Sequence, residues 1–186
     1  NEYVLRKAKE LGHEGAFFAW ESQETGDDAC TLFNVTDIFT NRPLRTYFKD
    51  KQIHVSADIV FAMWDYCRTT GDYTLLVDGG LNLMYESLWF FYTYASFKPH
   101  KNRYELLDVV GPDEYHERVG NNAFTNVMVK HAADILVQAI DKAKADNPDY
   151  LKEFNKDLSW VYDFAEKLYV PQPNEKGIIE QFDGYF

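Results

Sequence analysis

Residues 111–121 read G-P-D-E-Y-H-E-R-V-G-N and hold three carboxylates, a histidine, a tyrosine and an arginine. Gly111 and Pro112 end any preceding regular element, because proline has no amide proton and restricts the residue before it. Asn121 and Asn122 then supply turn and capping chemistry ahead of a long helical pattern. The segment is therefore predicted to be a loop between two helices, a place where catalytic groups often lie.

Helical periodicity surrounds this loop on both sides. Apolar residues recur at helical spacing over residues 1–11, 56 to about 70, 73 or 75 to about 97, about 122 to 145, and 150–168. Because no segment reads as a strand, we expect an all-α fold in which paired helices form a toroid. The long irregular stretch from about residue 13 to 53, and the apolar aromatic tail, predict that the chain is part of a larger domain.

Composition limits the classes of partner. The chain has 186 residues and a net charge of −11, so it repels nucleic acid and anionic membrane surfaces. No apolar run approaches the ~18 residues of a membrane span. The aromatic content of 17% fits either a core of large helices or a carbohydrate cleft. Cys30 and Cys67 lack metal-ligand spacing and are expected to be free thiols in a reducing compartment.

The motifs of the chain resemble those of glycoside hydrolase family 65, the inverting α-glucoside phosphorylases. Four segments carry the resemblance in order: G-H-E-G-A-F-F-A-W-E-S (12–22), H-V-S-A-D-I (54–59) running to T-G-D (70–72), G-P-D-E-Y-H-E with N-N-A-F-T-N (111–126), and Q-F-D-G-Y (181–185). One such motif is weak evidence, whereas four in the right order are strong evidence.

The resemblance implies an (α/α)6 barrel, with residues 1–186 as an internal part of that one catalytic domain. The flanking β domains and the remaining helices would lie outside this chain. It also implies an enzyme that acts on a disaccharide or small α-glucoside, with inorganic phosphate as co-substrate and no other cofactor. We expect the full-length protein to be a homodimer, and the free cysteines fit a cytoplasmic location. No metal is expected, because no His, Asp or Glu grouping has ligand spacing. The stretch from Thr31 to Asp50 is longer than its counterpart in many members and lies near the expected acceptor side, which leaves the acceptor sugar open.

Glu114 matches the general acid of the family. Cleavage of a glucosidic bond needs a proton on the leaving oxygen and a nucleophile on the opposite face of the sugar. The acid must be largely protonated near neutral pH, and we expect Asp113, Tyr115 and Glu117 to supply the necessary burial and negative charge. Without the resemblance, Glu114 would read as a solvated loop carboxylate.

Six further residues are expected to bind substrate: Trp20, Glu21, His54, Asp113, Tyr115 and His116. Trp20 offers a ring to stack on a sugar and Glu21 accepts hydrogen bonds from hydroxyls, although a core tryptophan beside a surface glutamate fits equally well. A lone histidine is more often a structural hydrogen-bonding group than a site residue. Asn121 and Asn122 are expected to cap the next helix.

Two alternative functions remain open at this point. The first is an inverting α-glucoside hydrolase on the same scaffold, in which water replaces phosphate and a second carboxylate acts as base. The second is a non-catalytic carbohydrate-binding module that keeps an aromatic cleft. Dependence of turnover on phosphate distinguishes the phosphorylase from the hydrolase, and sugar binding without turnover would favour the binding module.

Overall fold

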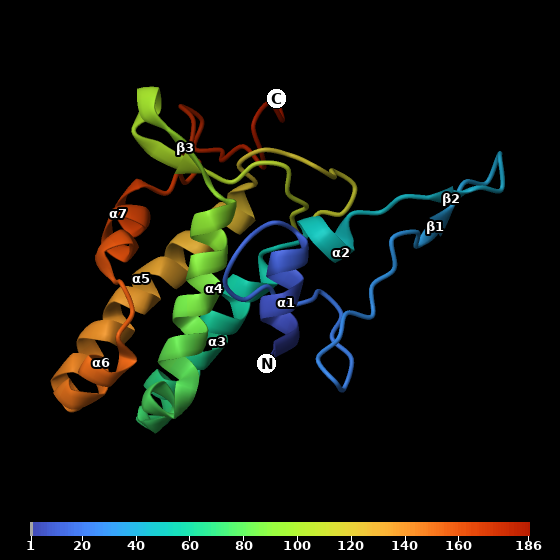
Figure 1. The fold of residues 1–186 in the computed structure, drawn as a ribbon. Helices are drawn as coiled ribbons and strands as arrows, with labels where there is room; N and C mark the ends of the chain where they lie inside the picture. The colour runs from blue at the N-terminus through green and yellow to red at the C-terminus, as the bar shows by residue number, and fades with distance from the viewer. Residues whose placement is uncertain (1) are drawn as a thin grey trace.

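Three long helices lie side by side in the computed structural model, which describes residues 2–186 (Figure 1). They are α3 (Val55–Thr70), α4 (Leu81–Tyr94) and α5 (Ala123–Asp146), and they run in alternating directions. α5 packs against both α3 and α4. The expected all-α character is therefore confirmed.

The core lies between these helices and is built from their apolar faces. Its fully buried members include Val60 of α3, Phe91 of α4 and Leu136 of α5. Burying a side chain of this size stabilises the fold by ~1.5–3 kcal/mol. Cys30 and Cys67 are both buried and unpaired, as expected. Within the described range, no helix has the length and apolar character required to cross a membrane.

Four shorter helices complete the helical part: α1 (Glu2–Glu10), α2 (Phe48–Lys51), α6 (Pro148–Phe154) and α7 (Ser159–Lys167). The single helix expected over residues 150–168 is wrong, because Asn155 adopts a left-handed conformation (φ 44°) that ends α6. A π-helical turn, η1 (Leu76–Gly80), precedes α4. α4 stops at Tyr94, three residues before the expected end.

Two short antiparallel hairpins correct the expectation that the chain has no strand. The first pairs β1 (Val35–Thr36) with β2 (Pro43–Leu44) and projects from the bundle (Figure 1). The second pairs β3 (Ser96–Lys98) with β4 (Arg103–Glu105), with a 3-10 turn, η2 (Pro99–Lys101), between them. Strands of two or three residues are too short to produce a readable alternation of apolar and polar residues.

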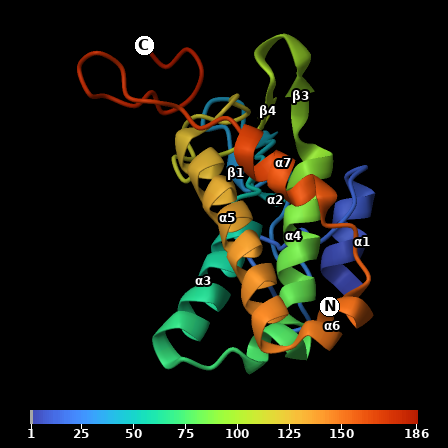
Figure 2. The same cartoon turned by 90° about the vertical axis from the view of Figure 1, so that its left-hand side faces the viewer.

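The helix ends follow the capping chemistry of the sequence. Gly71 ends α3 in a left-handed conformation (φ 73°), which glycine adopts without steric cost. Asn122 begins α5 by accepting a hydrogen bond from the Thr125 amide at 3.0 Å, so its predicted capping role is confirmed. The start of α3, the end of α4 and the start of α5 meet at one end of the bundle, where the C-terminal tail also lies (Figures 1 and 2).

Candidate active site

The loop that carries Glu114 is closed at its base. Val109 and Val119 exchange two main-chain hydrogen bonds of 2.9 Å, so residues 110–118 form a loop with a fixed neck. Beside this neck, Arg118 donates to both carboxylate oxygens of Asp108, at 2.7 and 3.3 Å. Lys51 lies 3.0 Å from the same carboxylate. The hydrogen bond from Arg118, helped by Lys51, holds the pKa of Asp108 below its usual value.

Asp113 organises the tip of this loop. Its Oδ1 accepts from the Tyr115 amide at 3.1 Å, and its Oδ2 accepts from His116 Nδ1 at 2.6 Å. Because an ionised carboxylate only accepts hydrogen bonds, His116 Nδ1 must carry a proton. The carboxylate accepts a third hydrogen bond, its second at Oδ2, from Gln181 Nε2 at 2.7 Å. These donors, with His116 the largest contributor, hold the pKa of Asp113 below its usual value.

Glu114 faces a hollow of about 410 Å³ between its loop and the β1–β2 hairpin. The hollow is lined by Val35, Leu44, Arg45, Thr46, Phe48, Glu114, Tyr115 and Glu117. Its volume lies within the ~300–1,000 Å³ range of small-molecule sites. Glu117 therefore lies near Glu114 as expected, but the expected covering by Tyr115 is wrong, because that ring is 97% exposed.

The C-terminal tail packs on the acid loop. The His116 ring lies 5.1 Å from the Phe182 ring and 5.8 Å from the Tyr185 ring. Asp183 accepts a hydrogen bond of 2.7 Å from Asn121, which is fully buried and left-handed at the end of the loop. The Q-F-D-G-Y motif and the G-P-D-E-Y-H-E motif, far apart in sequence, therefore meet at one site.

Trp20, His54 and Phe124 form a second cluster. The His54 ring lies 5.8 Å from the Trp20 ring and 5.1 Å from the Phe124 ring. Trp20 is 41% exposed, so it is not a core tryptophan, and Glu21 beside it is exposed as well. This leaves both side chains accessible to a ligand, and their role in binding sugar stays a prediction.

His54 is held by protein groups at both ring nitrogens. Nδ1 lies 2.8 Å from Asp58 Oδ2 and donates to it, while Nε2 lies 3.5 Å from the Gln52 amide nitrogen. The same Gln52 nitrogen lies 3.4 Å from the carbonyl oxygen of Gly111. Gln52 is fully buried and thus connects the Trp20 cluster to the start of the acid loop. Trp20, Glu21 and His54 do not line the hollow at Glu114.

The segment after Trp20 and Glu21 is fastened to α1 by a buried ion pair. Lys7 Nζ contacts Asp28 Oδ2, and their side chains are 5% and 1% exposed. Asp28 also accepts from the Cys30 amide at 2.8 Å. The Ala29 amide in turn donates to the main-chain carbonyl oxygen of Glu21 at 2.8 Å. This hydrogen bond connects the buried ion pair to the candidate binding residues Trp20 and Glu21.

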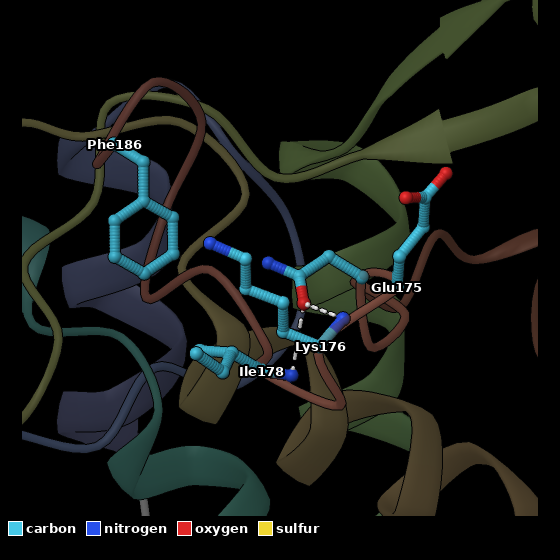
Figure 3. A pocket seen from close by; sticks show the side chains of 5 residues that line it. Glu175, Lys176, Ile178 and Phe186 are labelled. Atoms are coloured by element: carbon cyan, nitrogen blue, oxygen red, sulfur yellow. Dashed lines mark hydrogen bonds between the residues drawn. The ribbon is translucent and has the colours of Figure 1, made fainter.

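A further hollow of about 450 Å³ lies in the tail among Asn174, Glu175, Lys176, Ile178 and Phe186 (Figure 3). Asn174 shapes it by accepting hydrogen bonds from the Lys176 and Ile178 amides, at 2.9 and 3.1 Å. None of the predicted site residues lines it, so the hollow at Glu114 is the better candidate for chemistry. Across residues 2–186, no three His, Cys, Asp or Glu side chains are grouped as a metal site would need.

Comparison with known proteins identifies the family of the chain. Residues 2–186 match the model of the glycosyl hydrolase family 65 central catalytic domain. The chain belongs to glycosyl hydrolase family 65. The resemblance of the four motifs is thereby confirmed.

Named members of family 65 match along nearly the whole chain. It is 47% identical over 192 residues to a nigerose phosphorylase of Lachnoclostridium phytofermentans, covering 100% of this chain and 26% of that protein. It is 43% identical to a 1,2-α-glucosylglycerol phosphorylase of Bacillus selenitireducens, covering 97% of this chain and 24% of that protein. The chain thus spans about a quarter of the length of these family 65 relatives.

A solved structure agrees with the fold. It is described as a kojibiose phosphorylase from the human microbiome and superimposes with a TM-score of 0.78 at 25% identity. The superposition covers 98% of this chain and 24% of that one.

Two side chains of the candidate site were not singled out from the sequence. Gln52 and Gln181 each contact the acid loop, but neither has a neighbour in sequence that signals such a contact. For Gln181 the only signal was its place in the Q-F-D-G-Y motif.

Proposed function

We propose that the protein is an inverting α-glucoside phosphorylase in which Glu114 is the general acid. The observation that carries the proposal is the position of Glu114, at the tip of a braced loop and facing a hollow of ligand size. Membership of family 65 and the phosphorylase names of its relatives support the same reaction. In this proposal the described helices are part of an (α/α)6 barrel, and the full-length protein is a homodimer.

The proposed reaction needs one protein acid. A phosphate oxygen attacks C1 of the glucosyl unit as the bond from C1 to the leaving oxygen breaks, and Glu114 gives its proton to that oxygen. Attack from the opposite face gives β-glucose 1-phosphate and a free sugar or polyol. The proton remaining on the phosphate then returns to Glu114 through solvent, so the acid is restored. Inorganic phosphate is the co-substrate, and no metal or other cofactor takes part.

The second cluster is proposed to bind the glucosyl unit. The exposed Trp20 ring would stack on the sugar while Glu21 accepts hydrogen bonds from its hydroxyls. His54 would hold the Trp20 ring in place by its edge contact. The relatives point to a substrate panel of nigerose, kojibiose, trehalose and 1,2-α-glucosylglycerol. The β1–β2 hairpin lies across the hollow from Glu114 and would contact the acceptor.

Glu114→Gln in the full-length protein tests the proposal. The amide keeps the shape of the side chain but cannot donate a proton to the leaving oxygen, so turnover should fall by ~10²–10⁴-fold. Sugar binding, measured by calorimetry, should change little. Glu166→Gln is the matched control, because that carboxylate is exposed on α7 and contacts none of the site residues. Near-normal turnover by Glu114→Gln would eliminate Glu114 as the acid.

Product analysis with and without phosphate separates the alternatives. A phosphorylase releases glucose 1-phosphate only when phosphate is present. Release of free glucose at the same rate without phosphate would establish a hydrolase. Binding of the panel sugars without any turnover would establish a carbohydrate-binding module.

A further inference from the structure

The Glu114 carboxylate makes no hydrogen bond or ion pair with any other residue in the range 2–186, although its neighbours on both sides are tied down. Its position therefore depends on the main chain of its own turn. A general acid has to lie within ~2.6–3.2 Å of the oxygen it protonates. Whatever fixes the turn at residues 113–116 also fixes the acid.

Asp113 fixes this turn from within. One carboxylate oxygen accepts from the Tyr115 amide at 3.1 Å and the other from His116 Nδ1 at 2.6 Å, so Glu114 lies inside a ring closed by two hydrogen bonds. This is the side-chain-to-main-chain pattern by which aspartate stabilises turns. The turn is nevertheless exposed, since Glu114, Tyr115 and His116 all lie at the surface of the described chain.

Gln181 connects this turn to the helical bundle. Its side-chain Nε2 donates to Asp113 at 2.7 Å, and its main-chain carbonyl oxygen accepts from the Ala123 amide at 2.8 Å. Two residues later, the Asp183 amide donates to the Gly120 carbonyl oxygen at 3.0 Å. Gln181 thus links the first residue of α5, through its main-chain carbonyl, to the turn carrying Glu114, through its side chain; we call this link the strut.

We propose that Gln181, acting through Asp113, is a positioning residue that sets the Glu114 carboxyl for proton transfer. The proposal rests on the proposed role of Glu114 as the acid. Removing the Gln181 amide leaves the two main-chain bonds of the tail and the contact of Phe182 with His116, so the tail stays in place. What is lost is the tether on the turn, and a misplacement of about 1 Å in a catalytic group costs ~10²-fold in rate.

The experiment compares two substrates of the full-length protein, each with saturating phosphate. One is the member of the substrate panel that the wild-type protein turns over fastest, here called the natural substrate. Its leaving oxygen needs a proton. The other is α-glucosyl fluoride, in which phosphate displaces fluoride from C1 and fluoride leaves with little help from an acid. Gln181→Met removes the donor and nearly preserves side-chain length. We expect kcat on the natural substrate to fall by about 10–100-fold, while kcat on the fluoride changes by less than about 2-fold.

Gln172→Met is the matched control. Gln172 lies in the same tail and is exposed, and its Nε2 donates to the Val170 carbonyl oxygen at 3.0 Å, away from the turn. This variant should retain both activities. Asp113→Asn provides a second test, because asparagine has one acceptor oxygen for the three donors that the two carboxylate oxygens of Asp113 now accept from. It should show the same selective loss as Gln181→Met.

Equal losses on both substrates in Gln181→Met and Asp113→Asn would overturn the inference, since they would show a general structural role. Unchanged turnover of both substrates would overturn it as well. Glu114→Gln is the reference that separates the two proposals. If Glu114→Gln loses the natural substrate selectively while Gln181→Met does not, Glu114 is the acid and only the strut is wrong. If Glu114→Gln turns over the natural substrate normally, the proposed role of Glu114 as the acid is wrong, and the inference about Gln181 is refuted with it.

Discussion

Replacing Gly111 with alanine is expected to displace the side chain that begins α5. A methyl group on Gly111 would lie 2.3 Å from Nδ2, 2.6 Å from Cγ and 2.7 Å from Oδ1 of Asn122, far inside van der Waals contact. Asn122 is 2% exposed and has little room to move. Its Oδ1 accepts from the Thr125 amide at 3.0 Å and from the Thr125 hydroxyl at 3.1 Å, and both bonds are lost if the side chain turns away.

The magnitude follows from these contacts. Loss of an N-cap costs ~1 kcal/mol, within a range of 0.5–2. Because Thr125 is fully buried, its amide and hydroxyl donors would be left without acceptors. A buried polar group left in this state costs ~1–3 kcal/mol. We therefore expect the free energy of unfolding to fall by ~2–3 kcal/mol in total, with a lower Tm.

A double-mutant cycle in the full-length protein checks the reasoning by thermal melting. Asn122→Ala loses the same cap but also removes the atoms that the new methyl group would meet. Adding Gly111→Ala to Asn122→Ala should therefore cost less than about 0.5 kcal/mol further, which makes the two changes strongly non-additive. Additive effects, or a Gly111→Ala variant that melts like the wild type, would refute the overlap with Asn122.

Two further predictions concern the neighbouring clusters. Trp20→Ala should raise the KM for the glucoside by about 2–10-fold, which corresponds to the free energy of one aromatic stacking contact, with little change in Tm because Trp20 is 41% exposed. Tyr162→Ala, which removes an exposed aromatic side chain on α7, is the control. A large fall in Tm with an unchanged KM in Trp20→Ala would contradict the binding role. Asp108→Asn should make the free energy of unfolding depend less on pH in acid. Arg118 lowers the pKa of Asp108 in the folded state, so the ionised carboxylate stabilises the fold above its ordinary pKa of ~4. This stabilisation is lost as the pH falls through the lowered pKa. The Tm values of wild type and variant, measured from pH 6 to 3, should therefore converge at the acid end. Parallel Tm curves would contradict a stabilising Arg118–Asp108 pair.

The sequence predicted the parts of the fold that depend on local chemistry. The end of α3 at Gly71 and the start of α5 at Asn122 follow from left-handed glycine and from asparagine capping, both of which act within a few residues. The break between α6 and α7 was missed because asparagine is only a weak helix breaker, so the residue type alone does not predict the left-handed conformation of Asn155. The exposure of Tyr115 was missed because burial depends on which other segments cover a loop.

The contacts of the candidate site show the same limit more sharply. Asp113 and Gln181 are separated by 68 positions, and Gln52 and Gly111 by 59, so no local pattern connects the members of either pair. In each pair a glutamine side chain on a neighbouring segment ties down the loop that holds Glu114. Among residues 2–186, the hydrogen bonds that hold this loop are made by the residues around Glu114, whose own carboxylate is exposed and has no hydrogen-bond partner. In the proposed function this arrangement leaves the Glu114 carboxyl free to meet a substrate oxygen, and we expect a change in the residues that support it to reduce turnover before it reduces stability.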